Sequence, residues 1–262
     1  MSGFRNPLDG LDVYRALEEK LKKRGGPVLV TGLADAAKGQ FAEAVLAAER
    51  PLKLYVTYDE LRARELYEDL LSFGADAMFY PAKDLLFFAA DVRSNELSAV
   101  RIDVRRRIAE CGSGFVVTTI DALMDKLETP ERFLRRCLRI HASDRLDLGE
   151  TAKQLAALGY ERSAEVDGRG QFSVRGGILD VFPVTEETPV RIELWDDEID
   201  SMRRFDPESQ RSTEGLESVH IYPAREELLG GSDSFLRYFS GDKSLLILDE
   251  PARLLERARE VE

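Results

Sequence analysis

Short apolar runs alternate with helical patterns through the first half of the chain, and this alternation restricts the possible folds more than any other feature. Strands are predicted at residues 27–31, 52–57, 78–80 and 115–119, and amphipathic helices at residues 11–23, 39–48, 63–73 and 94–110. Each strand is a continuous apolar run, as in parallel sheets that helices cover on both faces. The expected architecture is therefore α/β with a parallel sheet.

The pattern changes near residue 141, where helices give way to closely spaced strand candidates. These lie at residues 160–166, 171–175, 178–182, 190–194 and 199–205, with hairpin-like turn signals at 168–170, 176–177 and 195–198. We expect residues 142–223 to form an inserted, mainly antiparallel domain with one short helix. Residues 1–141 and 224–262 are then two parts of the α/β domain, because the apolar strand at 244–248 is expected to return to the first sheet.

Composition excludes several classes of protein. The 262 residues carry a formal net charge of -12, which disfavours sequence-independent binding of nucleic acid, because neutralised phosphates supply most of that affinity. No apolar run approaches the ~20 residues of a bilayer span, and the N-terminus lacks the apolar segment of a signal peptide, so a cytoplasmic protein without membrane contact is expected. Cys111 and Cys137 have no second Cys or His at metal-ligand spacing, so neither a metal site nor a disulfide is expected.

The strongest local motif is the apolar run 28–31 followed by a loop and a helix, the arrangement of a phosphate-binding P-loop. That motif needs glycine directly before its lysine, where backbone N–H groups approach phosphate, and Ser or Thr directly after it, whose hydroxyl binds magnesium. Here the loop begins at Gly32, and Ala37 and Gly39 flank Lys38. Because the magnesium ligand is missing, we expect a degenerate nucleotide site without hydrolysis and without a cofactor.

A second relic lies near the end of the chain. Asp249 and Glu250 follow the apolar strand 244–248, which is the form of a Walker B strand whose Asp would complete a magnesium site. The two relics in this order favour descent from a nucleotide-binding protein. No catalytic residue is predicted, because neither His141 nor His220 belongs to a Ser, Cys or Asp/His grouping that would form a nucleophile–base pair.

Two charged clusters have both a structural and a functional interpretation. Arginines on the helix at 94–110 could follow a DNA backbone, but acidic neighbours at helical spacing favour a solvated face. The set comprises Arg101, Arg105, Arg106 and Arg107, with Glu96, Asp103 and Glu110 as partners. Carboxylates at residues 193, 196–198 and 200 could bind a metal, but a predicted hairpin tip favours a polar turn. Trp195 beside this turn is expected to be half-buried.

Two long stretches of the chain resemble a known family. GQFSVRGGILDVFP (170–183) and RIELWDDEIDSMRRFDPESQRS (191–212) are similar to the second domain shared by UvrB and the transcription-repair coupling factors. Similarity continues at residues 80–101, 117–124, 221–226 and 245–251. UvrB would keep a working P-loop and a tyrosine-rich DNA-clamping hairpin, which this chain lacks, so it is more similar to the coupling factors. The segment 227–244 is shorter than is usual in that family, and residues 230–232 fit an internal deletion, engineered or natural.

The resemblance implies a fold and a partner. The fold is a degenerate P-loop helicase-like parallel-sheet domain, split by an inserted domain of mainly antiparallel α+β type that docks on UvrA. RNA polymerase, DNA, ATP and magnesium would be bound by parts of the full-length protein outside this chain. The implied function is a non-catalytic module that recruits UvrA to stalled transcription complexes in nucleotide excision repair. The alternative is a UvrB-type ATP-dependent DNA damage-recognition subunit. Gly39 disfavours this alternative, because a working P-loop has Ser or Thr at that position.

The resemblance also implies contact residues for UvrA, namely Arg162, Arg175 and Phe182, with Glu161 where relatives often have a basic residue. Arginine suits this role because its planar guanidinium binds carboxylates bidentately, so an acidic patch on the partner is expected. Pairing within the chain, with acidic residues 165, 167 or 180, is the alternative.

Overall fold

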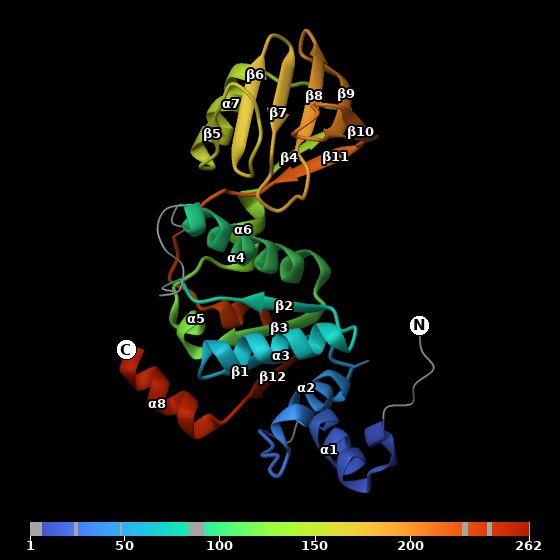
Figure 1. Ribbon diagram of the computed structural model, residues 1–262, viewed down its shortest axis with the longest axis vertical. Helices are drawn as coiled ribbons and strands as arrows, with labels where there is room; N and C mark the ends of the chain where they lie inside the picture. Colours follow the sequence, from blue (N-terminus) through green and yellow to red (C-terminus); the bar gives the residue numbers. More distant parts are fainter. Residues whose placement is uncertain are drawn as a thin grey trace. The chain divides into compact units, whose positions relative to one another are not determined.

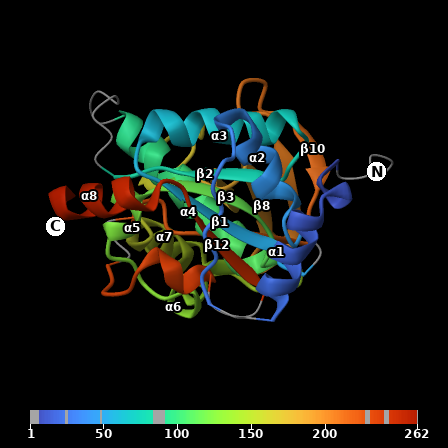
Figure 2. The same ribbon diagram turned by 90° about the horizontal axis from the view of Figure 1, so that it is seen from below.

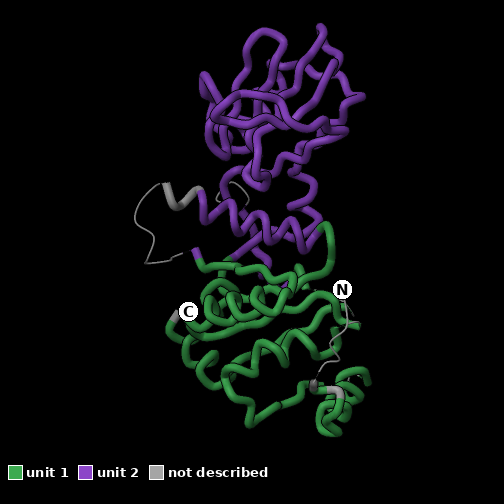
Figure 3. Tube along the Cα trace, turned by 45° about the vertical axis from the view of Figure 1, so that its right-hand side comes forward, with its two compact units in different colours: residues 1–82, 110–125, 238–262 green, residues 83–109, 126–237 purple. Residues whose placement is uncertain are grey.

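The chain divides into two structural units, each assembled from segments that are far apart in the sequence (Figure 3). The computed structural model describes residues 7–23, 26–47, 49–83, 92–226, 230–239 and 243–261. Unit 1 comprises residues 1–82, 110–125 and 238–262, and unit 2 comprises residues 83–109 and 126–237. The sequence also has an apolar segment at residues 85–88, expected to be a loop before the helix at 94–110, and this segment lies outside the described residues.

Unit 1 contains a parallel sheet and the helices that pack on it (Figure 1). Its elements are η1 (Pro7–Gly10), α1 (Asp12–Lys22), α2 (Asp35–Ala44), β1 (Leu52–Thr57), α3 (Glu60–Ser72), β2 (Ala77–Tyr80), β3 (Gly114–Thr119), α5 (Ile120–Met124), β12 (Ser244–Leu248) and α8 (Pro251–Val261). Helix η3 (Phe235–Phe239) spans the residues at which the chain passes from unit 2 to unit 1.

The sheet of unit 1 confirms the predicted α/β architecture. Its strand order is β12-β1-β3-β2, and all neighbouring pairs are parallel. β1 is central and buried along its whole length, and β12 pairs with it from Leu52↔Ser244 to Val56↔Leu248. The strand at 244–248 therefore returns to the first sheet. Side chains of α2 and α3 pack on one face against Tyr55, Phe115 and Val117, and Figure 2 shows α3 along that side of the strands.

The strand predicted at residues 27–31 is wrong. This segment pairs with no strand among the described residues, and Leu29 and Val30 are 78% and 41% exposed. An apolar run becomes a strand only when a neighbouring strand satisfies its backbone N–H and C=O groups, and here no such neighbour lies beside it. The following helix also begins earlier than predicted, at Asp35 instead of Gly39, and ends at Ala44.

The described residues of unit 2 form a larger, mainly antiparallel sheet, a separate two-stranded sheet and several helices (Figure 1). Its elements are α4 (Val92–Cys111, of which the last two residues belong to unit 1), α6 (Pro130–Arg135), β4 (Leu138–His141), α7 (Leu148–Ala157), β5 (Glu161–Arg162), β6 (Gln171–Arg175), β7 (Ile178–Val181), β8 (Val190–Trp195), β9 (Glu198–Phe205), β10 (Ser212–Gly215) and β11 (Ser218–Ile221).

The larger sheet has the strand order β10-β9-β8-β7-β6-β5, and the pairs from β6 to β10 are antiparallel, as predicted. β5 differs, because it pairs parallel with β6. The turn signal at 168–170 therefore does not form a hairpin, and the predicted strand at 160–166 shortens to Glu161–Arg162. The intervening chain turns back on itself instead, and the Gln171 side chain accepts hydrogen bonds from the N–H groups of Asp167 and Gly168.

β4 and β11 form a separate two-stranded antiparallel sheet, which the sequence analysis does not predict. The residues that pair, from Ser218↔His141 to Ile221↔Leu138, are distant in sequence. Close by, the Tyr160 hydroxyl donates a hydrogen bond of 2.9 Å to the carbonyl oxygen of Tyr222. Tyr160 directly precedes β5 and Tyr222 directly follows β11. The bond therefore links the chain segment that leads into the larger sheet to the segment that leads away from it.

Two arginines of α4 are buried in ion pairs. Arg101 Nε lies 2.7 Å from Glu226 Oε2, Arg105 Nη1 lies 3.4 Å from Glu226 Oε1, and Arg105 Nη2 lies 3.3 Å from Glu128 Oε1. The side chains of Arg101 and Arg105 are 1% and 0% exposed. The solvated face expected for this helix is therefore wrong for these two residues, because carboxylates from distant segments, not helix neighbours, neutralise them.

Aromatic rings pack against the buried ion pairs of Arg101 and Arg105, called the α4 network below, and a separate ion pair lies on the surface of the same helix. The Arg105 guanidinium lies 4.3 Å from the ring centre of Phe133, which stacks on Tyr222. Arg106 does pair with a helix neighbour, Asp103, at 2.7 Å. Arg101 and Glu226 end two of the segments that carry the family resemblance, 80–101 and 221–226, so the buried pair joins these two segments.

Candidate functional site

The loop that the sequence predicts to be a degenerate nucleotide site and the Asp-Glu pair near the end of the chain come together in unit 1. Lys38 Nζ lies 2.7 Å from Asp249 Oδ1 and 3.1 Å from Glu250 Oε1. It also lies 3.0 Å from Asp35 Oδ1, which in turn is 2.7 Å from Arg62 Nη2. The lysine that would bind phosphate in a P-loop is thus surrounded by carboxylates of the chain itself.

These contacts fix the protonation of the cluster. Burial alone would lower the pKa of Lys38, but hydrogen bonds to Asp249, Asp35 and Glu250 outweigh burial and raise it above its ordinary value. The hydrogen bond from Lys38 and the nearby Arg62 charge hold the pKa of Asp35 below its usual range. Both groups are therefore charged at neutral pH, and the ammonium group already has its counterions.

The backbone of the loop is also unsuited to a phosphate. α2 begins at Asp35, so residues 36–38 are already helical and the Ala37 N–H donates to the Ala34 carbonyl oxygen at 2.9 Å. A P-loop instead leaves such N–H groups free to surround the anion. Asp35 itself lies in the first turn of α2, where a negative charge is stabilised by the helix dipole.

The glycine after Lys38 has a packing role. A Cβ added at Gly39 would lie 3.2 Å from Leu66 Cδ1 and 3.8 Å from Asp69 Cβ, so Gly39 allows α2 to approach α3 closely. Gly32 has a φ of +83°, a conformation that glycine adopts at little cost, and a Cβ there would meet nothing within 4 Å. Gly39 is thus explained by helix packing, whereas Gly32 is explained by backbone conformation.

The second candidate site is the polar face of the larger sheet in unit 2. Strand pairing aligns Ser173, Asp180, Arg191 and Arg203 in one row across β6, β7, β8 and β9. Arg175 lies two residues from Ser173 and so on the same face. The opposite face, with Leu179 and Ile192, is buried. The alternation of the sequence therefore produces one apolar face and one charged face.

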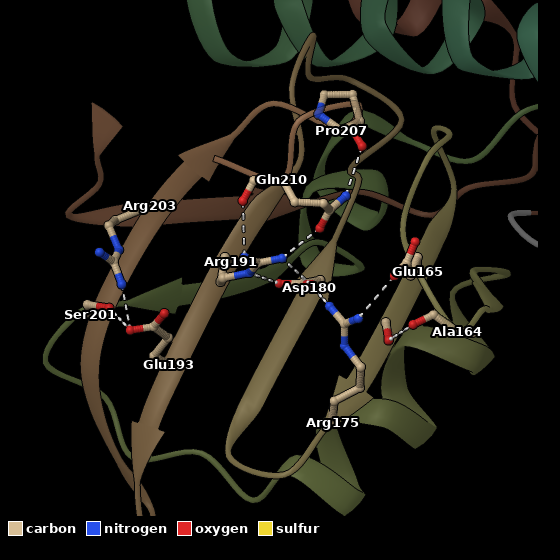
Figure 4. A network of polar contacts seen from close by, with 11 residues as sticks. Ala164, Glu165, Arg175, Asp180, Arg191, Glu193, Ser201, Arg203, Pro207 and Gln210 are labelled. Atoms are coloured by element: carbon tan, nitrogen blue, oxygen red, sulfur yellow. Dashed lines mark hydrogen bonds and ion pairs between the residues drawn. The ribbon is translucent and has the colours of Figure 1, made fainter. Parts of the chain in front are cut away.

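Asp180 is the centre of the charged face (Figure 4). Its side chain is 1% exposed and accepts hydrogen bonds from Arg175 Nη2 at 2.9 Å and from Arg191 Nε and Nη2 at 2.7 and 2.9 Å. This hydrogen bonding raises the pKa of Arg191. Arg191 Nη2 also donates to Gln210 Oε1 at 2.9 Å. Arg191 is mostly buried, whereas 44% of the Arg175 side chain is exposed.

A second ion pair continues the charged face toward β9. Arg203 Nη2 lies 2.5 Å from Glu193 Oε2, which also accepts a hydrogen bond of 3.0 Å from Ser201 Oγ (Figure 4). The Arg203 and Glu193 side chains are 38% and 33% exposed. Charges on this face are thus paired in the free protein but remain within reach of a partner.

The three residues implied by the resemblance take different positions. Arg175 points outward from the charged face and pairs with Asp180 and, at 3.8 Å, with Glu165. Arg162 is exposed on β5, and its side chain makes no hydrogen bond or ion pair with the part of the chain that the structure describes. By register Arg162 aligns with Phe172, so Arg162 and Arg175 leave the sheet on alternate faces.

Phe182 is 7% exposed and packs in a cluster with Val166 and Phe205. The Arg191 guanidinium lies 4.4 Å from the ring centre of Phe205. Phe182 is therefore part of a buried apolar cluster next to the charged face and is not an exposed anchor.

Sequence reasoning missed Arg191 and Gln210. Arg191 could have been found, because it lies opposite Asp180 once hairpin register is assumed, but Gln210 reaches the network from a loop by way of a left-handed backbone with φ of 58°. Trp195 was expected to be half-buried, which is wrong, because it is 80% exposed at the end of β8. The carboxylates that follow it form a polar turn as expected, with Arg145 paired to Asp197 and Glu198.

Two further observations limit the chemistry of the described residues. They contain no group of three or more His, Cys, Asp and Glu side chains arranged to hold a metal ion. None of their helices is long and apolar enough to cross a membrane.

Comparisons with known proteins show similarity to one domain family and to one group of longer proteins. Residues 138–226 match the model of the UvrB interaction domain. The chain is 34% identical over 223 residues, 84% of its length, to the transcription-repair-coupling factor of Bacillus subtilis (strain 168), and covers 19% of that protein. It is 33% identical over 203 residues, 77% of its length, to the transcription-repair-coupling factor of Staphylococcus aureus (strain bovine RF122 / ET3-1), and covers 17% of it. The chain thus spans less than a fifth of these relatives, and it is similar to them over a region in which its own residues 138–226 match the UvrB interaction domain.

Proposed function

We propose that this chain is a non-catalytic protein-interaction module that recruits UvrA in transcription-coupled nucleotide excision repair. The observation that carries the proposal is the coincidence of two features over residues 138–226. This segment matches the UvrB interaction domain, and it contains the charged face centred on Asp180. A rigid row of arginines and carboxylates fits a protein partner better than a small substrate, because the charges are paired and lie on a sheet.

Within this proposal each implied residue has a definite role. Arg175 contacts UvrA carboxylates, because its guanidinium is half-exposed and Asp180 holds it in one orientation. Arg162 contacts UvrA from the edge of the sheet, where it has no competing partner among the described residues. Phe182 acts from beneath, by supporting Phe205 and so Arg191.

We further propose the domain division and the ancestry that the resemblance implies. Residues 142–223 form the inserted UvrA-binding domain, and residues 1–141 and 224–262 are two parts of a degenerate P-loop helicase-like domain. The self-neutralised cluster around Lys38, with Asp249 and Glu250 at the end of β12, supports this ancestry. Contacts with RNA polymerase and DNA, and the use of ATP and magnesium, belong to other parts of the longer protein.

Calorimetric titration of the chain with purified UvrA tests the recruitment proposal. A one-to-one binding isotherm that weakens in Arg175→Ala is expected. Absence of binding by the folded wild-type chain would contradict the proposal.

An ATPase assay tests the absence of catalysis and the UvrB-type alternative together. We expect no magnesium-dependent turnover, because Lys38 is occupied by three carboxylates and no hydroxyl follows it. Turnover that disappears in Lys38→Ala would favour the ATP-dependent alternative.

A further inference from the structure

The edge of the larger sheet at β5 carries arginines whose environment differs from that on the charged face. β5 is the last strand of this sheet and pairs only with β6. Glu161 and Arg162 are both exposed there. Edge strands are where partners reach a sheet most easily, because one side of the strand has no neighbour.

A second guanidinium reaches this edge from a distant segment. Arg225, which follows β11, lies with Nη2 2.6 Å from Glu161 Oε1, and the two side chains are 44% and 66% exposed. Residue 224 is also close to the start of β6, because a Cβ added at Gly170 would lie 3.9 Å from Ala224 Cβ. The β5 edge therefore presents Arg162 and the Arg225–Glu161 pair on the two sides of one short strand.

Charge makes this edge distinctive. Residues 142–223 contain 9 Lys and Arg against 18 Asp and Glu, so the surface around it is predominantly acidic. On the charged face, the arginines are held by carboxylates such as Asp180 that are almost fully buried. At the β5 edge Arg225 pairs with Glu161, a carboxylate that is itself exposed. An exposed pair contributes only ~0 to 1 kcal/mol, so little is lost when a partner's carboxylate replaces it.

We propose that Arg225 is a further partner-contact residue, which acts with Arg162 on an acidic segment of UvrA, and that Glu161 lowers the affinity by competing for Arg225. This inference rests on the proposed function and adds a residue and a regulatory contact to the same interaction. Relatives often have a basic residue at the position of Glu161. The inference explains how the β5 edge still presents two guanidinium groups although residue 161 is acidic here. The second group comes from position 225, and Glu161 orients it.

Titration of UvrA with four forms of the full chain tests this assignment, with melting temperature as the check on folding. Arg225→Ala is expected to weaken binding about tenfold, because a guanidinium at a desolvated contact is lost. Glu161→Ala is expected to tighten binding roughly two- to fivefold, because the competing carboxylate is gone. The double variant should behave like Arg225→Ala. Arg145→Ala, which breaks a similar exposed pair at the β8–β9 turn, should leave the affinity unchanged.

The outcomes separate the two proposals. If the wild-type chain binds UvrA and Arg225→Ala binds equally well, the assignment of Arg225 is overturned while the proposed function stands. If Glu161→Ala weakens binding, Glu161 contacts the partner directly and the competition is overturned. If the wild-type chain does not bind UvrA, the proposed function itself fails. A tighter Glu161→Ala complex is evidence that misfolding cannot imitate.

Discussion

Two groups of arginines in unit 2 both pair with carboxylates, but one group is buried and the other is half-exposed. In the α4 network, Arg105 is paired with Glu128 and Glu226 and all three side chains are at most 2% exposed. On the charged face, Arg175 is paired with Asp180, but 44% of its side chain remains exposed. The buried group can serve only the fold, because no partner can reach it. The half-exposed group can serve both the fold and recognition.

Burial also decides how much free energy each group of ion pairs costs. Burial raises the pKa of Glu128, although Arg105 and Arg136 act in the opposite direction, so ionisation of this carboxylate has an energetic cost. A buried ion pair is weak evidence for net stability, but removal of one member leaves an uncompensated buried charge. The same truncation at the surface exposes the remaining charge to water. Mutations should therefore separate the two groups clearly.

The largest effect is expected from Glu226→Ala. Both Arg101 and Arg105 would lose their shared carboxylate while remaining buried, and removal of one partner of a buried pair typically destabilises a fold by ~3 to 5 kcal/mol. Urea denaturation measures this loss. Arg106→Ala, which breaks a surface pair on the same helix, is the matched control and should cost under ~1 kcal/mol. Equal losses would show that depth does not distinguish the pairs.

The next effect is on binding. Arg175→Ala should weaken UvrA binding by ~2 to 5 kcal/mol, as is usual for an arginine lost from a desolvated contact. Its effect on stability should stay near ~0 to 1 kcal/mol, because Arg191 continues to pair with Asp180 through two hydrogen bonds. Titration and thermal melting of the same sample distinguish the two. Unchanged affinity in a folded variant would remove Arg175 from the interface.

A smaller effect is expected from Lys38→Met in unit 1. Asp249, 4% exposed, would lose its 2.7 Å contact with Lys38 and keep the longer contact with Arg62 Nε at 3.5 Å, which should cost ~1 to 3 kcal/mol. The affinity for UvrA should not change, since the relic cluster serves the fold. Denaturation and titration of this variant together check both statements. A loss of affinity without loss of stability would give the relic site a part in recognition.

The smallest effect concerns Lys53, a buried cation that is bound by backbone carbonyl oxygens. Lys53, 4% exposed, donates to the Ala42 and Glu43 carbonyl oxygens at the end of α2, and burial lowers its pKa to about 8. The unfolded chain, with a pKa near ~10.4, binds this proton more tightly, so stability should rise with pH by about 1 kcal/mol between pH 8 and 9. Urea denaturation at both pH values measures the rise. Lys53→Met should remove it, and a variant with the same pH dependence would contradict the assignment.

The sequence predicts those parts of the fold that depend on local pattern. The alternation of β6 to β9 gives the charged face, and the apolar runs of β1, β3 and β12 give the parallel sheet. The candidate site is predicted less completely. Arg162 and Arg175 are found by resemblance, but the partners of Arg175 remain a choice among three acidic residues until register places Asp180 beside it.

The errors arise where distant segments decide the outcome. Residues 27–31 have a strand-like composition but no neighbour to pair with among the described residues. Arg101 and Arg105 have the sequence context of a solvated face, yet Glu226, over 100 residues away, removes them from water. β5 pairs parallel because the chain turns back before β6. Local periodicity contains no information on any of these contacts.

The first turn of α2 has a consequence for how such a module behaves in a cell. Asp35 supplies an anion at the place where a nucleotide-binding loop would receive one from solution, and Lys38 and Arg62 hold it there. A loop that is permanently filled by its own side chain does not sense the energy state of the cell. At this loop, therefore, a change in ATP concentration is not expected to change the surface that the chain presents.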